Sequence, residues 1–362
     1  MESFNRVLIR MPNWLGDVVM ATPLLRTFRE NLPRAHLAIL IQPSGAKLLE
    51  GLPGVDEVIR YDRRGEHAGL GGMLKLAKEL RGKQFDLAVC CPNSMSSALS
   101  LFFARIPRRV GWSYGGRGVL LTDRLKPPMQ GHRRVARPMP QYYLDLARHL
   151  DCETFSPRSS LAVTQGGREE AAAFRVKKGI DPDTPLVGLN VGAAFGPSKH
   201  WTPQGFADTA AGLKAKYGMR AVVLCGPGEE ELGRTIEEAI GGDVVRTSDH
   251  ILTLSGLKAF VSELAFMVTT DTGPRHFAIA FDIPHVCVMG STNPLMTDQP
   301  EARGEVVRLD PLLECMPCHE KVCPLQHHDC LEKLAAAPVL AAVERVLALP
   351  PRERTAPPAR VV

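Results

Sequence analysis

Short apolar runs alternate with longer amphipathic stretches along most of the chain. Apolar runs rich in Val, Ile and Leu predict strands in the first half at 6–10, 36–41, 58–61 and 85–90. The stretches between them predict helices over 18–31, 70–81 and 94–104, with Pro23 implying a kink or a start near Thr22. Strands that alternate with helices pair in parallel, so the pattern predicts a doubly wound α/β sheet.

The alternation resumes after a polar connection that contains an amphipathic helix near 168–178, and the domain boundary is expected there. Further strands are predicted at 186–191, 221–225, 266–268 and 284–289. The expected organisation is a first domain over 1–165, a linker over 166–184, a second domain over 185–330, a helix over 331–349 that packs back across the junction, and a disordered tail over 350–362.

Composition is that of a soluble globular protein, and the 362-residue length favours two domains. The net charge of +5 is too modest to indicate nucleic acid. No apolar run approaches the ~20 residues that span a bilayer. Residues 1–5 lack the features of a signal peptide, so a cytoplasmic location is expected.

The loop after the first predicted strand holds one glycine, Gly16, and one carboxylate, Asp17. A single glycine does not make a dinucleotide fingerprint, which disfavours a nicotinamide oxidoreductase. Open parallel sheets bind ligands at the carboxyl ends of their strands. Asp17 is therefore either a helix-capping residue or a general base for an incoming hydroxyl.

Two loops of the second half suggest a nucleotide site. Lys199 follows a glycine-bearing loop and is either a point charge on a phosphate or a solvated lysine. Gly226 would let a ligand approach the backbone, and Glu229, Glu230 or Glu231 could accept a bond from a ribose hydroxyl. The three glutamates also suit a helix N-terminus without any ligand.

The segment 266–280 reads as a buried strand, a polar turn and a helix. Residues 270–272 supply an N-cap, Gly273 opens the turn, and Pro274 suits a first helical turn. Free backbone N–H groups at such a helix start can bind a phosphate, with His276 within one turn. The alternative is a capped helix in which Asp271 serves only as a cap.

The segment 105–137 is strongly basic and rich in glycine and proline, which predicts a loop. Asp123 alone opposes nine arginines and lysines in it. The segment is either a solvated surface loop or a clamp for a polyanionic substrate.

Eight of the nine cysteines fall into two groups. Cys90, Cys91, Cys225 and Cys287 lie in or beside apolar strands and are expected to be buried thiols. Cys315, Cys318, Cys323 and Cys330, near three histidines, have ligand types suited to a structural zinc ion, although their spacing is not that of a standard zinc ribbon. Reduced cysteines in a loop, or an occasional disulfide, are the alternatives.

Three motifs together resemble the heptosyltransferase family of glycosyltransferases. They are Gly16-Asp17, the run 195–201 (FGPSKHW) and the run 271–276 (DTGPRH), and the cysteine-containing tail is also similar. The resemblance covers about residues 6–347. It implies a GT-B fold, with two Rossmann-like domains that face a cleft. It further implies metal-free, cofactor-free, inverting transfer of heptose from ADP-heptose to the heptosyl-Kdo inner core of lipopolysaccharide, by an enzyme peripheral at the cytoplasmic face of the inner membrane.

The resemblance also implies roles for individual residues. Asp17 takes the place of the catalytic base and Lys199 that of the lysine on the donor diphosphate. The other donor-binding positions are Gly16, Gly226, Glu229, Glu230, Asp271, Thr272, Gly273 and His276. The acceptor-binding positions expected are Arg63, Arg64, Arg117, Arg133, Arg134 and Arg137.

Two departures bear on specificity, namely Arg275 in place of an apolar residue and Ala193-Ala194 in place of a more polar pair. The remaining alternatives are a family member with another acceptor or nucleotide-sugar, a non-hydrolysing epimerase, and a metal-binding interaction protein. The lopsided basic segment argues against an epimerase, which has no acceptor to bind.

Overall fold

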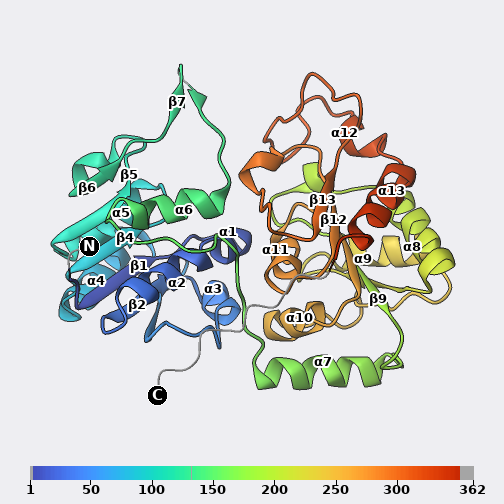
Figure 1. Cartoon of the computed structure of the whole chain (residues 1–362), viewed down its shortest axis with the longest axis horizontal. Helices are drawn as coiled ribbons and strands as arrows, with labels where there is room; N and C mark the ends of the chain where they lie inside the picture. Colours follow the sequence, from blue (N-terminus) through green and yellow to red (C-terminus); the bar gives the residue numbers. More distant parts are fainter. Residues whose placement is uncertain (1–2, 132, 351–362) are drawn as a thin grey trace.

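The computed structural model describes residues 3–131 and 133–350, and it contains two parallel sheets, each covered by helices (Figure 1). The predicted fold class is confirmed. Within the described residues, no helix is long and apolar enough to cross a membrane.

The first half forms a six-stranded sheet in the order β3-β2-β1-β4-β5-β6, in which all neighbours are parallel. Its strands are β1 (Arg6–Arg10), β2 (His36–Ile41), β3 (Glu57–Arg60), β4 (Leu87–Cys90), β5 (Arg108–Trp112) and β6 (Asp123–Leu125). Its helices are α1 (Leu15–Met20), α2 (Thr22–Asn31), α3 (Pro43–Leu48), α4 (Gly69–Gly82), α5 (Met95–Phe103), the 3-10 turn η1 (Arg117–Leu120) and α6 (Met139–Arg148). A short antiparallel hairpin, β7 (Met129–Gln130) and β8 (Arg133–Arg134), stands apart from the sheet (Figure 1).

The second half forms a five-stranded parallel sheet in the order β10-β9-β11-β12-β13. Its strands are β9 (Leu186–Asn190), β10 (Arg220–Leu224), β11 (Phe266–Thr270), β12 (His285–Val288) and β13 (Gly304–Val307). Its helices are α7 (Gln165–Lys177), η2 (Pro197–Lys199), α8 (Pro203–Tyr217), α9 (Glu230–Ile240), α10 (Leu254–Val261), α11 (Gly273–Ala280), η3 (Pro294–Met296), α12 (Asp329–Glu332) and α13 (Ala336–Leu347).

The strand order places the loops of interest. In the first sheet, β2 and β3 are added on one side of β1, and β4, β5 and β6 on its other side, so the strand order reverses at β1. In the second sheet β9 lies between β10 and β11 in the same way. Loops at such switch points diverge to opposite faces and leave a crevice at the carboxyl ends of the strands. The loops after β1, β9 and β11 are therefore the ones set to meet a ligand.

Two expectations from the sequence concern where helices and loops begin and end. The predicted break near Thr22 is present, since α1 ends at Met20 and α2 begins at Thr22 with Pro23 in its first turn. The segment 105–137 is less of a loop than predicted, because it supplies β5, β6 and a hairpin.

The C-terminal helix was predicted to cross the junction between the halves, and this was wrong. It packs on α8, β12 and β13, and it buries Val339, Val343 and Val346 in a core formed only by residues of the second half. The apolar stripe of α13 is buried against its own sheet and α8. The predicted tail lies outside the described residues from 351 onward.

The two halves share one continuous core. It includes Val7 and Ile9 of the first sheet together with Met267 and Phe277 of the second half. Helix α1 packs on α11, and α10 packs on both α3 and α7 (Figure 1). Lys258 of α10 is fully buried and donates hydrogen bonds from Nζ to the carbonyl oxygens of Leu48 (3.0 Å) and Glu50 (3.1 Å). These contacts fix the two ligand edges opposite each other.

Candidate active site

Asp17 lies in the first turn of α1, directly after the loop that leaves β1. Its Oδ1 accepts a hydrogen bond from the Tyr143 hydroxyl of α6 at 3.0 Å. Burial raises the pKa of the Asp17 carboxyl from its ordinary 3.8 to about 6; the Tyr143 hydrogen bond and the Lys199 charge oppose this rise, and the charge of Asp271 adds to it. Asp17 is thus an ionised carboxylate at neutral pH with the basicity of a competent general base.

Asp271, at the end of β11, is held by three donors from three segments. Its carboxylate accepts from Lys199 Nζ (2.7 Å), Thr292 Oγ1 (2.8 Å) and Arg275 Nη1 (3.2 Å). Burial alone would raise the pKa of Asp271, but Lys199 and Arg275 outweigh it and hold the pKa far below its ordinary value. Asp271 is therefore a permanent anion that positions cations and does not act as a helix cap.

Lys199 is bonded to Asp271, two residues before α11 begins. Its ammonium donates to both the carboxylate and the backbone carbonyl of Asp271, each at 2.7 Å, and lies 4.9 Å from the Phe195 ring centroid. The loop after β9 bends through η2, so a lysine 72 residues away in sequence reaches the end of β11. The ammonium is mostly buried and held where it could also meet a phosphate oxygen.

The start of α11 is open to an anion. Thr272 occupies the N-cap position, but its side chain makes no capping hydrogen bond and instead accepts from Asn190 Nδ2 at 2.7 Å. The expectation that residues 270–272 supply the N-cap is therefore confirmed in position only, because the Thr272 hydroxyl is bonded to Asn190 of β9 and caps no N–H group. The first backbone N–H groups of α11 consequently keep their capacity to bind an oxyanion.

His276 lies buried at the contact between the halves. The amide nitrogen of Gln299 is 3.1 Å from its Nδ1, so Nδ1 is the acceptor and the hydrogen resides on Nε2. Burial, followed by the charge of Arg275, lowers the pKa of His276 to about 3 and keeps the ring neutral. A Cβ added at Gly16 would lie 2.8 Å from His276 Cδ2, so only glycine allows α1 to approach this ring.

The β10 loop places Gly226 and Glu229 at the sheet edge beside the loop after β9. Glu229 Oε2 accepts from the Gly226 backbone N–H at 2.7 Å, and its carboxylate occupies the space that a side chain at Gly192 would need. Glu230 begins α9, where its own backbone N–H and that of Gly228 lower its carboxyl pKa. Glu229 is thus the glutamate turned toward the neighbouring loop.

The arginines predicted to bind the acceptor lie in different environments. Arg117 is fully buried, with Nε donating to the Trp112 carbonyl at 2.8 Å and Nη1 bonded to the Pro92 carbonyl. The prediction that it binds acceptor was wrong, because its guanidinium fixes η1 to the loop after β4. Arg137 pairs with Asp145 of α6 at 2.6 Å. Arg63 and Arg64 are exposed, whereas the side chains of Arg133 and Arg134 lie outside the described residues.

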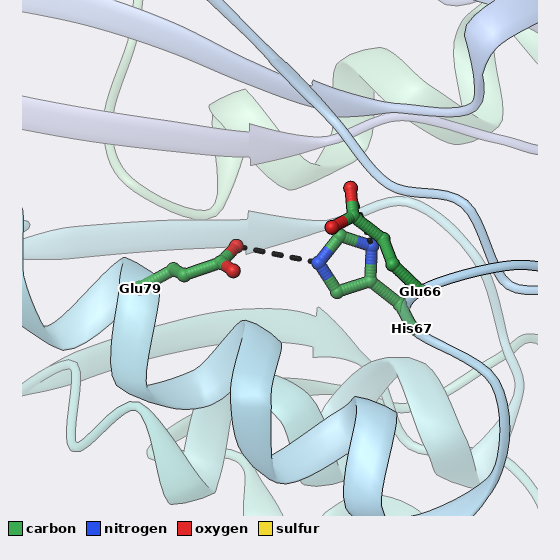
Figure 2. Close-up of side chains that lie close together, drawn as sticks. All are labelled: Glu66, His67 and Glu79. Atoms are coloured by element: carbon green, nitrogen blue, oxygen red, sulfur yellow. Dashed lines mark hydrogen bonds and ion pairs between the residues drawn. The ribbon is translucent and has the colours of Figure 1, made fainter.

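The loop that bears Arg63 and Arg64 leads to a buried histidine, His67. Its ring lies between the carboxylates of Glu66 and Glu79 (Figure 2). His67 Nδ1 accepts from the Asp62 backbone N–H at 3.1 Å, so its Nε2 carries the hydrogen and donates to Glu79 at 3.3 Å. Glu66, His67 and Glu79 have ligand atoms within 4.8 Å of one another. Both ring nitrogens are already engaged, however, which makes the group an anchor for the arginine loop rather than a metal site.

The cysteines divide as predicted. Cys90, Cys91, Cys225 and Cys287 are buried thiols. Cys315, Cys318, Cys323 and Cys330 line a single cavity, and backbone N–H groups of His328 and residues 325–327 lower the pKa of the Cys323 thiol. The same cavity is also lined by Ser198, the neighbour of Lys199.

Several site residues were not predicted. Tyr143, Thr292 and Gln299 contact Asp17, Asp271 and His276 from other segments, and no local sequence pattern marks them. Arg275 was noted only as a departure, but it pairs with Asp271 and donates to Thr297 Oγ1 at 2.8 Å. Each contact depends on the meeting of distant segments.

The Asp17 carboxylate at the ligand edge of one Rossmann-like domain therefore faces Asp271, Lys199 and the start of α11 on the other. Two facing domains and this site define a glycosyltransferase of the GT-B class. The sequence profile of glycosyltransferase family 9 (heptosyltransferase) matches residues 73–328, well over half of the chain. The chain belongs to this family.

Individual relatives agree with this assignment. The chain is 29% identical to lipopolysaccharide heptosyltransferase 2 of Salmonella typhimurium over 84% of its own length and 88% of the relative. The solved structure of E. coli ADP-heptose LPS heptosyltransferase II superposes with a TM-score of 0.73, at 25% identity, over 94% of this chain and 98% of that one. A family 9 glycosyltransferase from Veillonella parvula superposes with a TM-score of 0.80, at 22% identity, over 95% and 97% of the two chains.

Proposed function

We propose that this glycosyltransferase moves heptose from ADP-heptose to the heptosyl-Kdo inner core of lipopolysaccharide, with inversion at the anomeric carbon. The single observation that supports it best is the placement of Asp17 opposite the Lys199–Asp271 pair and the start of α11. The names of the similar proteins supply the sugar and the nucleotide.

One displacement accounts for the whole reaction. The acceptor hydroxyl oxygen forms the new bond to the anomeric carbon while the bond from that carbon to the β-phosphate oxygen breaks, and ADP leaves. The hydroxyl proton passes to the Asp17 carboxylate. Attack from the side opposite the leaving group inverts the anomeric configuration.

Charge that develops on the departing diphosphate is matched by groups already in place. Lys199 offers an ammonium, α11 offers its uncapped N–H groups, and His276 offers a neutral Nε2–H donor. None of these groups must change its protonation state. Glu229, beside Gly226, is placed to accept from the adenosine ribose.

The acceptor would enter over the first half. Arg63 and Arg64 are exposed on the loop held by His67 and present charge to phosphate and acid-sugar groups. The enzyme would meet its lipid-linked acceptor at the cytoplasmic face of the inner membrane as a peripheral protein.

Calorimetric titration tests the donor half of the proposal. The wild type should bind ADP more tightly than UDP, and Lys199→Ala should lose about tenfold or more in ADP affinity, the cost of one charge-assisted hydrogen bond. Lys216→Ala, which removes an exposed ion pair with Glu344, is the matched control and should bind ADP as the wild type does. A preference for UDP would contradict the assignment of an ADP-sugar donor.

An assay with ADP-heptose tests the acceptor half. Transfer to heptosyl-Kdo lipid A, followed by mass spectrometry, should add one heptose to each acceptor. Transfer only to an acceptor that lacks the first heptose would place the enzyme in another branch of the family.

A further inference from the structure

Four cysteines from one 16-residue segment meet around a single small cavity. Cys315, Cys318, Cys323 and Cys330 all line it, together with Met316, Pro324 and Leu325. Its volume of about 20 Å³ holds about one atom-sized occupant. None of the four cysteines forms a disulfide.

Two histidines line the cavity beside the four thiols, and each already has one ring nitrogen engaged in a hydrogen bond. His328 Nε2 lies 3.1 Å from the Ser198 carbonyl oxygen, and His327 Nδ1 accepts from the Asp329 backbone N–H at 2.9 Å. Four thiolates around a space for one ion form the donor set that zinc takes in closed structural sites.

The four sulfur atoms line the cavity but lie farther apart than the ligand atoms of a bound metal ion. Within the described residues, only the group around His67 has three ligand atoms that all lie within 4.8 Å of one another. Sulfur atoms around a tetrahedral zinc ion stand about 3.8 Å apart, given a zinc–sulfur bond of about 2.3 Å. A bound ion would therefore draw the thiols inward and tighten the segment 315–330.

That segment is bonded directly to the loop that bears Lys199. Ser198 donates from its backbone N–H to the Lys321 carbonyl (3.1 Å) and from Oγ to the Glu320 carbonyl (2.5 Å). A Cβ at Gly196 would lie 2.5 Å from the Lys321 carbonyl oxygen, so the two segments are in close contact.

The loop after β12 also contacts the cysteine-containing segment 315–330. The His319 backbone N–H donates to the Ser291 carbonyl at 2.8 Å, and Ser291 Oγ lies 3.2 Å from Ser198 Oγ. The next residue, Thr292, donates to Asp271. The segment 315–330 is thus hydrogen-bonded to the loops after β9 and β12, which both contribute donors to Asp271.

We propose that Cys315, Cys318, Cys323 and Cys330 bind one zinc ion, which fixes the segment 315–330 and thereby positions Lys199. The ion takes no part in bond making or breaking. Ser198 connects this segment to Lys199. That Lys199 binds the donor belongs to the proposed function, so the expected effect of zinc on ADP binding rests on that function. The metal site itself does not, since metal content is measured without any donor.

Metal analysis of the full-length protein tests the site. Protein purified under reducing conditions, without added metal, should contain one zinc per chain by plasma mass spectrometry. Cys318→Ser and Cys323→Ser should each lower that content severalfold, whereas Cys152→Ser, which removes a buried thiol of the first half, should leave it unchanged. Circular dichroism checks that the variants fold.

A second measurement keeps the test independent of variant folding. Zinc is removed from the wild type by a chelator and then restored. The metal-depleted chain should bind ADP about tenfold more weakly and melt at a lower temperature, and zinc should restore both. Lys199→Ala should show no change in ADP affinity on depletion, because the positioned group is already absent.

Three outcomes would overturn the proposal. They are a metal-free reduced protein that takes up no zinc, an iron atom in place of zinc, and a disulfide among these cysteines in the active enzyme. Zinc at one per chain with unchanged ADP affinity on removal would overturn the positioning role. Failure of wild-type zinc-loaded protein to bind ADP would contradict the proposed function and leave the metal result standing.

Discussion

Replacement of Asp17 by asparagine should greatly reduce activity and at the same time stabilise the fold. The carboxylate is partly buried beside Asp271, and burial raises its pKa to about 6. Its charge is therefore unfavourable in the folded chain at neutral pH. Asp17→Asn removes that charge while its amide oxygen can still accept from the Tyr143 hydroxyl.

The size of the effect follows from the pKa. A rise from 3.8 to about 6 corresponds to about 3 kcal/mol at pH 7.5, since one pKa unit is worth about 1.4 kcal/mol. The folded-state pKa lies above the unfolded value, so the folded wild type binds more protons between these two values and loses stability as pH rises through them. The penalty is about 1.6 kcal/mol at pH 5 and vanishes below pH 3.8.

Urea unfolding of both proteins at pH 7.5 and pH 5 measures this. Asp17→Asn should be more stable by about 1–3 kcal/mol at pH 7.5, and its advantage should shrink by about half at pH 5. Its kcat should fall by about 10²–10⁴, the usual effect of removing a general base. Asp208→Asn, on the exposed face of α8, is the control and should change stability by less than about 0.5 kcal/mol.

Two results would refute this reasoning. An Asp17→Asn variant less stable than the wild type at pH 7.5 would show that the carboxylate is stabilised by its surroundings. Retained activity would show that another group accepts the proton.

Three further predictions follow from the same geometry. The wild-type kcat/KM should fall tenfold per pH unit below about pH 6, as the base with that pKa becomes protonated, and a flat profile down to pH 5 would contradict the role of Asp17. Gly16→Ala should cost about 1–3 kcal/mol in thermal unfolding, since its Cβ would lie 2.8 Å from His276, whereas Gly71→Ala, whose Cβ meets nothing within 4 Å, should cost none; equal losses would refute the close-contact explanation. Arg117→Met should lower the free energy of unfolding by about 2–5 kcal/mol, because it leaves buried carbonyl groups without their donor. Arg63→Ala should raise the acceptor KM and leave stability unchanged. The reverse pattern would restore Arg117 as a binding residue.

The sequence predicted most of the secondary structure because its signals are local. The alternation of apolar runs with amphipathic stretches gave the strands and helices of both halves, and Pro23 marked the break between α1 and α2. Local pattern failed where the outcome depended on a partner. The basic segment 105–137 was predicted to be a loop, but pairing with β4 turns part of it into sheet. Arg117 is buried because its guanidinium bonds to the carbonyl groups of Trp112 and of Pro92, which lies after β4.

By itself, the sequence determined which chemical groups follow the parallel strands, since the hydrophobic period marks where each strand ends and its loop begins. It thereby indicated Asp17, Lys199 and Asp271 as candidates for the site. Only the tertiary structure decided their states. The raised pKa of Asp17, the Lys199–Asp271 pair and the neutral ring of His276 arise from burial and from charges that come together when α1 packs on α11. Electrostatic energy depends on distance and solvent exposure, and for residues more than 70 positions apart these exist only in the folded chain.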